Sequence, residues 1–363
     1  MDEIDKWNDF VDTEGGSFFH YFEWKYVFEV NKRKFIPLII EDENSHIIGI
    51  MPIIRLKNFI FPSIMSPPDG SGGFLLRRDL IEDDRLKAIN NLISFINHNY
   101  SKSCSNFILK ESVSLTNRYD TEPLPILIEN KFMCKWNHNT QLPSLHILEL
   151  MQGFEENIWH GLWRKHLRQE VKRAQKLGVS VIIDNELRYA EDFQEMLIDM
   201  YRRKGSIVPS KDEIDERLNR FKNKTKLYVA LFNSKPIAAE LCYYTRTTCY
   251  ISKLSSSEIA YKMDAARLLD YKIIHDACNN GYKFVDFGSS TKESLASWKD
   301  SYEGRRLLNK IYERRYSTTR YIIERTIFYI YYCVIYNKFI WKNKNKLAEK
   351  VLRQLKDHAH MYS

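Results

Sequence analysis

Residues 281–290 read Gly-Tyr-Lys-Phe-Val-Asp-Phe-Gly-Ser-Ser, and this stretch decides the fold of the second half of the chain. Its apolar run predicts a buried strand. Gly281 ends a helical pattern that covers residues 264–279, and Gly288 closes the strand. The amides and hydroxyls of residues 288–290 are therefore expected at a strand end, which is where α/β folds bind their ligands. A short helix over residues 293–301 follows and carries Lys299.

The rest of the second half predicts alternating helices and strands. A basic amphipathic helix over residues 159–177 is expected to end at Gly178, because glycine is the usual residue after a helix end. The spacing of apolar residues predicts further helices over residues 190–203 and 211–222. Strands are expected over residues 179–183, 227–232, 236–244, 248–252 and 307–316. Three of these strands, between residues 227 and 252, form an antiparallel meander.

The first half has a similar order of elements. Two strands over residues 35–41 and 46–55 flank the polar turn 42–45, which predicts a hairpin. The glycine- and proline-rich residues 66–73 separate it from a helix over 79–97 and a strand over 107–109. We therefore expect an α/β (α+β) chain of two tandem domains with mixed, largely antiparallel sheets. The expected ranges are 1–150 and 151–318, with a helical tail over 319–363.

Composition excludes several classes of protein. The chain has 363 residues, a formal charge of +8 and hydrophobic residues at 44%, which rules out a disordered or collagen-like chain. Its six cysteines form no C-x-x-C pair, which argues against a disulfide framework and suits a reducing cytoplasm. No H-E-x-x-H motif, Cys/His cluster or Walker motif occurs, so we predict no metal site. The charged N-terminus lacks the apolar region of a secretory signal, and we expect a cytoplasmic protein.

Six segments carry a resemblance to a known family. In chain order they are Gly16–Trp24, Gly49–Ile53, Pro68–Gly73, Lys165–Val179, Pro236–Ala239, and Gly281–Gly288 followed by Trp298 and Lys299. Together they resemble the tandem acyltransferases of the GNAT superfamily, in particular the FemAB-like group of peptidoglycan aminoacyltransferases and their acetyltransferase relatives. The match spans residues 16–310. The resemblance implies two GNAT-like domains and the transfer of an acyl group.

The acyl donor is open between two classes. The resemblance implies acyl-CoA, but the segment Ser255–Met263, where the family has its pyrophosphate loop, contains no glycine. Because glycine lets backbone amides approach a phosphate closely, this departure argues against coenzyme A. The family's coiled-coil arm, used near tRNA, is also missing, since we find no long heptad insertion. This second departure argues more strongly against aminoacyl-tRNA.

The catalytic candidates follow from the needs of acyl transfer to an amine, which are positioning, a site for the developing oxyanion, and removal of a proton. In a GNAT-like domain two central strands part, and here they would part near Tyr250 and Asp286. Asp286 is a candidate base, with a turn-capping role as the alternative. Tyr250, like Tyr244, could offer a phenol as acid, and a place in the core is the alternative. Lys299 aligns with the family's F-K lysine and could neutralise an oxyanion.

Candidate substrate contacts are mostly basic. Lys165, Arg168 and Lys172 recur at helical spacing and form a basic stripe that suits a phosphorylated substrate. Further expected contacts are Gly288, Ser289, Ser290 and, in the glycine loop of the first half, Asp69. The alternative for the stripe is a solvated helix face, and for Asp69 a role in the turn.

The tail over residues 320–363 carries +6 of the +8 charge and an aromatic-rich helix. It could contact an anionic membrane at its inner face, while the alternative is a helix docked on the second domain. We predict no specific nucleic-acid partner. The expected function is N-acyl transfer, acetyl or aminoacyl, to a primary amine of an anionic cell-envelope or glycan precursor, as in polysaccharide biosynthesis. The alternative is a non-catalytic GNAT scaffold that binds anionic polymer or membrane through this tail.

Overall fold

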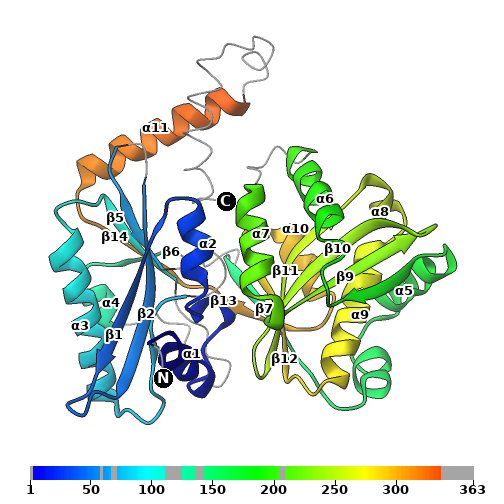
Figure 1. The fold of residues 1–363 in the computed structure, drawn as a ribbon, viewed down its shortest axis with the longest axis horizontal. Coiled ribbons are helices and arrows are strands. Elements are labelled where there is room, and N and C mark those ends of the chain that lie inside the picture. Colours follow the sequence, from blue (N-terminus) through cyan, green and yellow to red (C-terminus); the bar gives the residue numbers. More distant parts are fainter. Residues whose placement is uncertain are drawn as a thin grey trace. The chain divides into compact units, whose positions relative to one another are not determined.

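The computed structural model describes residues 3–57, 60–66, 72–110, 125–135, 143–203 and 209–336, with side chains as far as Ile330. The described parts form two compact units, one within residues 1–136 and 310–363 and the other within residues 137–309 (Figure 1). Each unit contains a seven-stranded sheet with helices on it. The α/β class that the sequence predicts is confirmed.

The sheet of the first unit has the order β1-β2-β3-β5-β14-β6, and β4 pairs with β2. Its strands are β1 Lys34–Glu41, β2 Ile47–Leu56, β3 Ser63–Met65, β4 Leu75–Leu76, β5 Asn106–Lys110, β6 Met133–Lys135 and β14 Ile311–Arg315. Its helices are α1 Glu3–Thr13, η1 Phe18–His20, α2 Trp24–Val30, α3 Glu82–Tyr100, α4 Pro125–Glu129 and α11 Thr318–Tyr336. The hairpin β1–β2 and the helix α3 lie where the sequence predicts them.

The sheet of the second unit has the order β13-β7-β12-β11-β10-β9-β8. Its strands are β7 Ser144–Glu149, β8 Ser180–Asp184, β9 Thr225–Phe232, β10 Lys235–Tyr244, β11 Thr248–Ser256, β12 Phe284–Ser290 and β13 Arg305–Leu308. Its helices are η2 Phe154–His160, α5 Lys165–Lys176, α6 Ala190–Arg203, α7 Lys211–Arg220, η3 Lys222–Lys224, α8 Glu258–Lys262, α9 Ala265–Asn279 and α10 Glu293–Asp300.

Among the described strands, each sheet is antiparallel except for one parallel pair. In the first sheet β3 and β5 are parallel, and the chain between them contains α3. In the second sheet β11 and β12 are parallel, and the chain between them contains α9. A parallel pair needs a crossover connection of this kind, usually a helix. The repeated strand–helix–strand unit agrees with the expected tandem arrangement.

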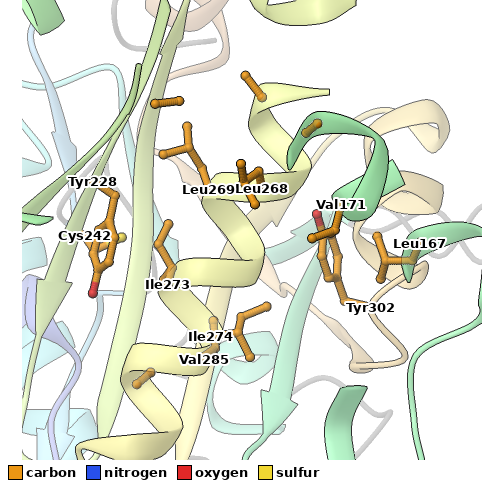
Figure 2. Packing of buried hydrophobic residues seen from close by; sticks show 14 of the residues in the cluster. Leu167, Val171, Tyr228, Cys242, Leu268, Leu269, Ile273, Ile274, Val285 and Tyr302 are labelled. Atoms are coloured by element: carbon orange, nitrogen blue, oxygen red, sulfur yellow. The ribbon is translucent and has the colours of Figure 1, made fainter. Parts of the chain in front are cut away.

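The core of the second unit forms around α9. Leu269 and Ile273 of this helix are fully buried and lie on the same side as Tyr228 and Cys242 of the neighbouring strands, while Val171 of α5 lies on the other side (Figure 2). The glycines that follow α5 and α9 end these helices, as the sequence analysis predicted. Gly178 and Gly281 have φ of +87° and +75°, a left-handed conformation that ends α5 and α9.

Three details of the sequence prediction need correction. The predicted helix 159–177 is interrupted, because Arg164 has an extended backbone and α5 begins only at Lys165. The strand predicted over residues 307–316 is two strands, β13 in the second sheet and β14 in the first. In the described residues the tail helix α11 is hydrogen-bonded to the first unit, whereas the sequence analysis gave docking on the second domain as the alternative. Arg320 donates to the carbonyl of Lys102 at 2.7 Å, and the Glu324 carboxylate accepts from the backbone amides of residues 60 and 61.

The two units also differ from the predicted domain ranges. β7 precedes residue 150 and belongs to the second sheet, and β14 precedes residue 319 and belongs to the first. Strand pairing joins residues far apart in the chain, so composition and periodicity do not report it.

Candidate functional site

The two central strands of the second sheet part in the middle. β11 and β12 pair at Thr248 with Phe284, Cys249 with Val285 and Tyr250 with Asp286. Both strands then continue, to Ser256 and Ser290, without a further pair between them. The ladder therefore ends at the two residues where the sequence analysis expected the strands to separate.

A bulge on each strand accompanies this separation. On β11, Ser252 has no partner in β10, because Leu241 pairs with Lys253 and Cys242 with Ile251. On β12, the register with β7 shifts between Asp286 and Ser289, and Gly288 adopts a φ of +72°. Bulges re-aim the local backbone and are frequent beside active sites. Residues other than glycine rarely adopt this backbone conformation, so the glycine at position 288 permits the turn.

Lys299 of α10 is bound to this turn. Its side chain is buried, with 8% of the residue exposed, and its ammonium donates to the carbonyl oxygens of Gly288 at 2.9 Å and Ser289 at 3.0 Å. An ammonium has three N–H donors, so the third is left without a partner among the described residues. Burial lowers the pKa of Lys299 to about 8, although the Asp286, Asp270 and Glu240 carboxylates favour its charged form.

Asp286, on β12, lies beside Lys299 of α10. Its Oδ1 accepts a hydrogen bond from the Gly288 amide at 2.7 Å, which is the turn-capping contact that the sequence analysis named as an alternative. Its Oδ2 has no hydrogen-bond partner within the described parts of the chain. Burial raises the pKa of Asp286 to about 6, while the Gly288 amide and Lys299 oppose the rise. A carboxylate of this pKa can both cap the turn and accept a proton.

The remaining predicted residues of the turn lie close by. Tyr250 is 7% exposed and is paired with Asp286 across the ladder. The Ser289 hydroxyl accepts from the Asn309 side chain at 2.9 Å. The Ser290 hydroxyl is fully buried and has no hydrogen-bond partner among the described residues. The structure therefore gathers Tyr250, Asp286, Ser289, Ser290 and Lys299 at the place where the strands part.

Two buried carboxyl groups near Lys299 were not predicted. Glu240 of β10 is 4% exposed and Asp270 of α9 is 5% exposed. Burial raises the pKa of Glu240 well above its usual range, and the neighbouring Asp270 adds to the rise. Burial raises the pKa of Asp270 to about 6, against a hydrogen bond from Tyr302 and the charge of Arg267. The signal in the sequence was one acidic residue inside the otherwise apolar strand 236–244.

A buried histidine was also missed. His146 of β7 lies opposite the β12 bulge, and its Nδ1 is 3.0 Å from Asp300 Oδ1. Its Nε2 is 3.0 Å from the hydroxyl of Ser144. Burial lowers the pKa of His146 to about 4, and the charges of Lys299 and Arg306 contribute, so the imidazole is neutral near pH 7. The alternation of side chains along a strand predicts only that His146 points inward, and it does not distinguish this histidine from any other buried residue.

The basic stripe divides into exposed and structural members. Lys165 and Lys172 are exposed on α5, and neither forms an ion pair among the described residues. Arg168 is half-buried, and its guanidinium donates to the carbonyls of Trp159, at 3.0 Å, and Trp163, which joins α5 to the preceding turn. No contact in the described parts of the chain brings the stripe to Lys299. Asp69 lies outside the described residues.

The segment expected at the pyrophosphate loop is helical. Residues 258–262 form the short helix α8, and Asp264 has a left-handed backbone with φ +51° before α9 begins. Arg173 of α5 donates to the Asp264 carboxylate at 2.5 Å. Neither this segment nor any other described part holds three or more His, Cys, Asp or Glu side chains grouped as a metal site. No helix in the described ranges is long and apolar enough to span a membrane.

A family model matches the part of the chain that carries this site. The model of the acetyltransferase (GNAT) domain family matches residues 163–300, which hold β11, β12 and α10. A search of curated proteins finds no match.

Solved structures share the fold of the chain at low sequence identity. FemX has a TM-score of 0.70 and 11% identity, with 89% of this chain and 99% of FemX covered. L-PGS from Bacillus licheniformis has a TM-score of 0.56 and 13% identity, covering 89% and 95%. A tandem GNAT protein from the clavulanic acid biosynthesis pathway has a TM-score of 0.52 and 9% identity, covering 86% and 95%. The chain therefore shares the fold of a tandem GNAT protein, and its residues 163–300 match the model of the GNAT acetyltransferase domain.

Proposed function

We propose that the protein transfers an acyl group, acetyl or aminoacyl, from a carrier to a primary amine of an anionic cell-envelope or glycan precursor. The observation that carries the proposal is the Lys299 ammonium, which the carbonyls of Gly288 and Ser289 fix where the strands part. Its third N–H donor has no partner among the described residues, and Asp286 lies beside it.

The reaction needs two proton movements. The amine nitrogen attacks the acyl carbonyl carbon, a C–N bond forms, and the bond from that carbon to the carrier sulfur or oxygen breaks. Asp286 accepts the proton lost by the nitrogen, and the Tyr250 phenol donates one to the leaving carrier; solvent then restores both groups. The free N–H of Lys299 donates to the oxyanion that develops on the carbonyl. A fixed donor of this kind stabilises the transition state more than the ground state.

The anionic character of the acceptor is proposed from charge. The exposed ammonium groups of Lys165 and Lys172, with no ion-pair partner among the described residues, suit a phosphorylated acceptor. The C-terminal domain of a putative lysylphosphatidylglycerol synthetase is among the structures of similar fold, and its name, which refers to a membrane lipid, favours an envelope acceptor. The donor that a GNAT domain implies is acyl-CoA. The helical, glycine-free segment before α9 offers no glycine turn for its pyrophosphate, so aminoacyl-tRNA stays the second donor to test.

The proposal is tested by the variant Lys299→Met, with Lys292→Met as the matched control. Lys292 is exposed at the start of the same helix. Ligands that copurify with the protein are first identified by mass spectrometry, and transfer from acetyl-CoA or aminoacyl-tRNA to an aminosugar phosphate is then followed. We expect Lys299→Met to lower kcat about 100-fold or more, as expected for loss of an oxyanion donor. Full activity in this variant would remove Lys299 from the mechanism.

A peripheral membrane contact is a second proposal, and it belongs equally to the non-catalytic alternative. Ile322 and Ile330 on α11 are each 56% exposed, and the sequence after this helix is rich in lysine. Apolar side chains beside basic residues suit the inner, anionic face of a membrane. Deleting residues 337–363 tests both ideas. A membrane-anchored enzyme should lose vesicle binding but keep turnover on a soluble acceptor, whereas a binding scaffold should show no turnover before or after the deletion.

A further inference from the structure

A cavity lies in the second unit, where β9 begins and β10 ends. It has a volume of about 220 Å³, and its lining includes Lys222, Thr225, Lys226, Tyr244 and Tyr282. Tyr244 ends β10 and pairs with Cys249 at the start of β11. The β11–β12 ladder ends one residue further along, at Tyr250 and Asp286. The cavity is lined by other residues than the site around Lys299, because none of Tyr250, Asp286, Gly288, Ser289 and Lys299 belongs to its lining.

The lining of the cavity is positively charged. Lys226 is neutralised by Asp276, which accepts from its ammonium at 2.8 Å, and the same ammonium lies 5.2 Å from the centre of the Tyr244 ring. Lys222, at the turn before β9, is exposed and has no ion-pair partner among the described residues. Lys224 adds a further positive charge to the lining. The Asp276 carboxylate balances only the charge of Lys226, so an anion that enters the cavity meets a net positive charge.

Thr225 supplies an independent observation. This residue is the first of β9 and is 6% exposed, and its hydroxyl is buried without a hydrogen-bond partner in the described structure. Buried hydroxyl groups in proteins nearly always have a hydrogen-bond partner, and leaving one unpaired is unfavourable. Because Thr225 lines the cavity, a ligand in the cavity could supply that partner.

Size limits the ligand. Each molecule of liquid water occupies about 30 Å³, so the cavity holds the volume of roughly seven waters. Pockets for drug-sized molecules begin near 300 Å³. A phosphate group with a few carbon atoms fits this volume.

We propose that this cavity binds a phosphate monoester, with the phosphate between the Lys222 ammonium and the Thr225 hydroxyl. Lysine binds phosphate as a point charge, and a hydroxyl adds a directed hydrogen bond. The Tyr244 and Tyr282 rings, 5.0 Å apart, then face the carbon part of the ligand. The phosphate could belong to a soluble metabolite or to a lipid headgroup.

Binding is tested with the full chain in the absence of any acyl donor, so the result does not depend on whether the protein transfers acyl groups. Glycerol phosphate is titrated into the protein by calorimetry at low salt. We expect saturable binding with a Kd of about 1 mM or tighter. Thr225→Val keeps the shape of the side chain and removes the hydroxyl, and Lys222→Gln removes the charge. Each should weaken binding about tenfold, because each variant removes one polar contact with the charged phosphate.

The control is Lys235→Gln, an exposed lysine at the start of β10, which should bind like the unmodified protein. Circular dichroism checks that all variants are folded. Vesicles that contain phosphatidic acid, whose headgroup is a phosphate monoester, distinguish the two sources of phosphate, because a headgroup site binds these vesicles and loses this binding in Lys222→Gln. The proposal is overturned if glycerol phosphate and vesicles both fail to bind, or if Lys222→Gln and Thr225→Val bind as tightly as Lys235→Gln.

Discussion

Replacement of Asp286 by asparagine should stabilise the protein while it strongly lowers the rate of acyl transfer. An asparagine Oδ1 can still accept the hydrogen bond from the Gly288 amide, so the turn is preserved. The substitution removes only the buried negative charge. Burial raises the pKa of Asp286 from 3.8 to about 6, which means that the folded state disfavours the ionised carboxylate. The shift corresponds to about 3 kcal/mol at a pH where the group is ionised in both states.

The sign of the pH dependence follows from the raised pKa. Between pH 3.8 and pH 6 the folded protein binds more protons at this residue than the unfolded chain, so this contribution to stability falls as the pH rises. The amide of Asp286→Asn resembles the protonated carboxyl group at every pH. The free energy of unfolding of the variant should therefore exceed that of the unmodified protein by about 3 kcal/mol at pH 7.5 and by about 1 kcal/mol at pH 4.5.

The assay is urea unfolding at these two pH values, together with kcat at pH 7.5. Asp83→Asn, on the exposed face of α3, is the control and should change neither quantity. Loss of a general base should lower kcat about 100- to 10,000-fold. The reasoning is refuted if Asp286→Asn is less stable than the unmodified protein at pH 7.5, or if the stability difference does not shrink at pH 4.5. Retained activity would refute the role of the carboxylate as a base.

Three further outcomes are expected. The pH profile of kcat/KM should be bell-shaped. The rate constant should rise through the pKa of Asp286 at about 6 and fall through the pKa of Lys299 at about 8. A flat profile between pH 5 and 9 would contradict these roles. Gly288→Ala should destabilise the protein by about 1–2 kcal/mol, because φ is +72° there, and an unchanged urea midpoint would speak against that strain. Ile273→Ala, in the α9 core, should cost about 2–5 kcal/mol; a loss below 1 kcal/mol would show that the cavity collapses.

The sequence predicted the part of the site that lies in one continuous segment. Asp286, Gly288, Ser289 and Ser290 follow one strand, and Lys299 lies on the next helix, so local pattern and resemblance together located them. The structure brings all of them to the end of the β11–β12 ladder. Their chemical roles stay predictions, since a hydrogen bond in a turn does not report catalysis.

The sequence could not show what the folded chain adds to this segment. Glu240, Asp270 and His146 come from three other elements, and each alone resembles an ordinary polar residue in an apolar pattern. Arg168 was predicted to bind substrate, and the structure shows its guanidinium on two backbone carbonyls. That role of Arg168 in substrate binding remains untested.

The sequence by itself determined the class of fold, the positions of most elements and the glycine ends of α5 and α9, because these depend on neighbouring residues along the chain. The tertiary structure alone decided that β14 joins the first sheet and β13 the second. It also decided which buried charges surround Lys299. The physical reason is that strand register and charge burial depend on contacts between residues that are distant in sequence, and periodicity does not encode such contacts.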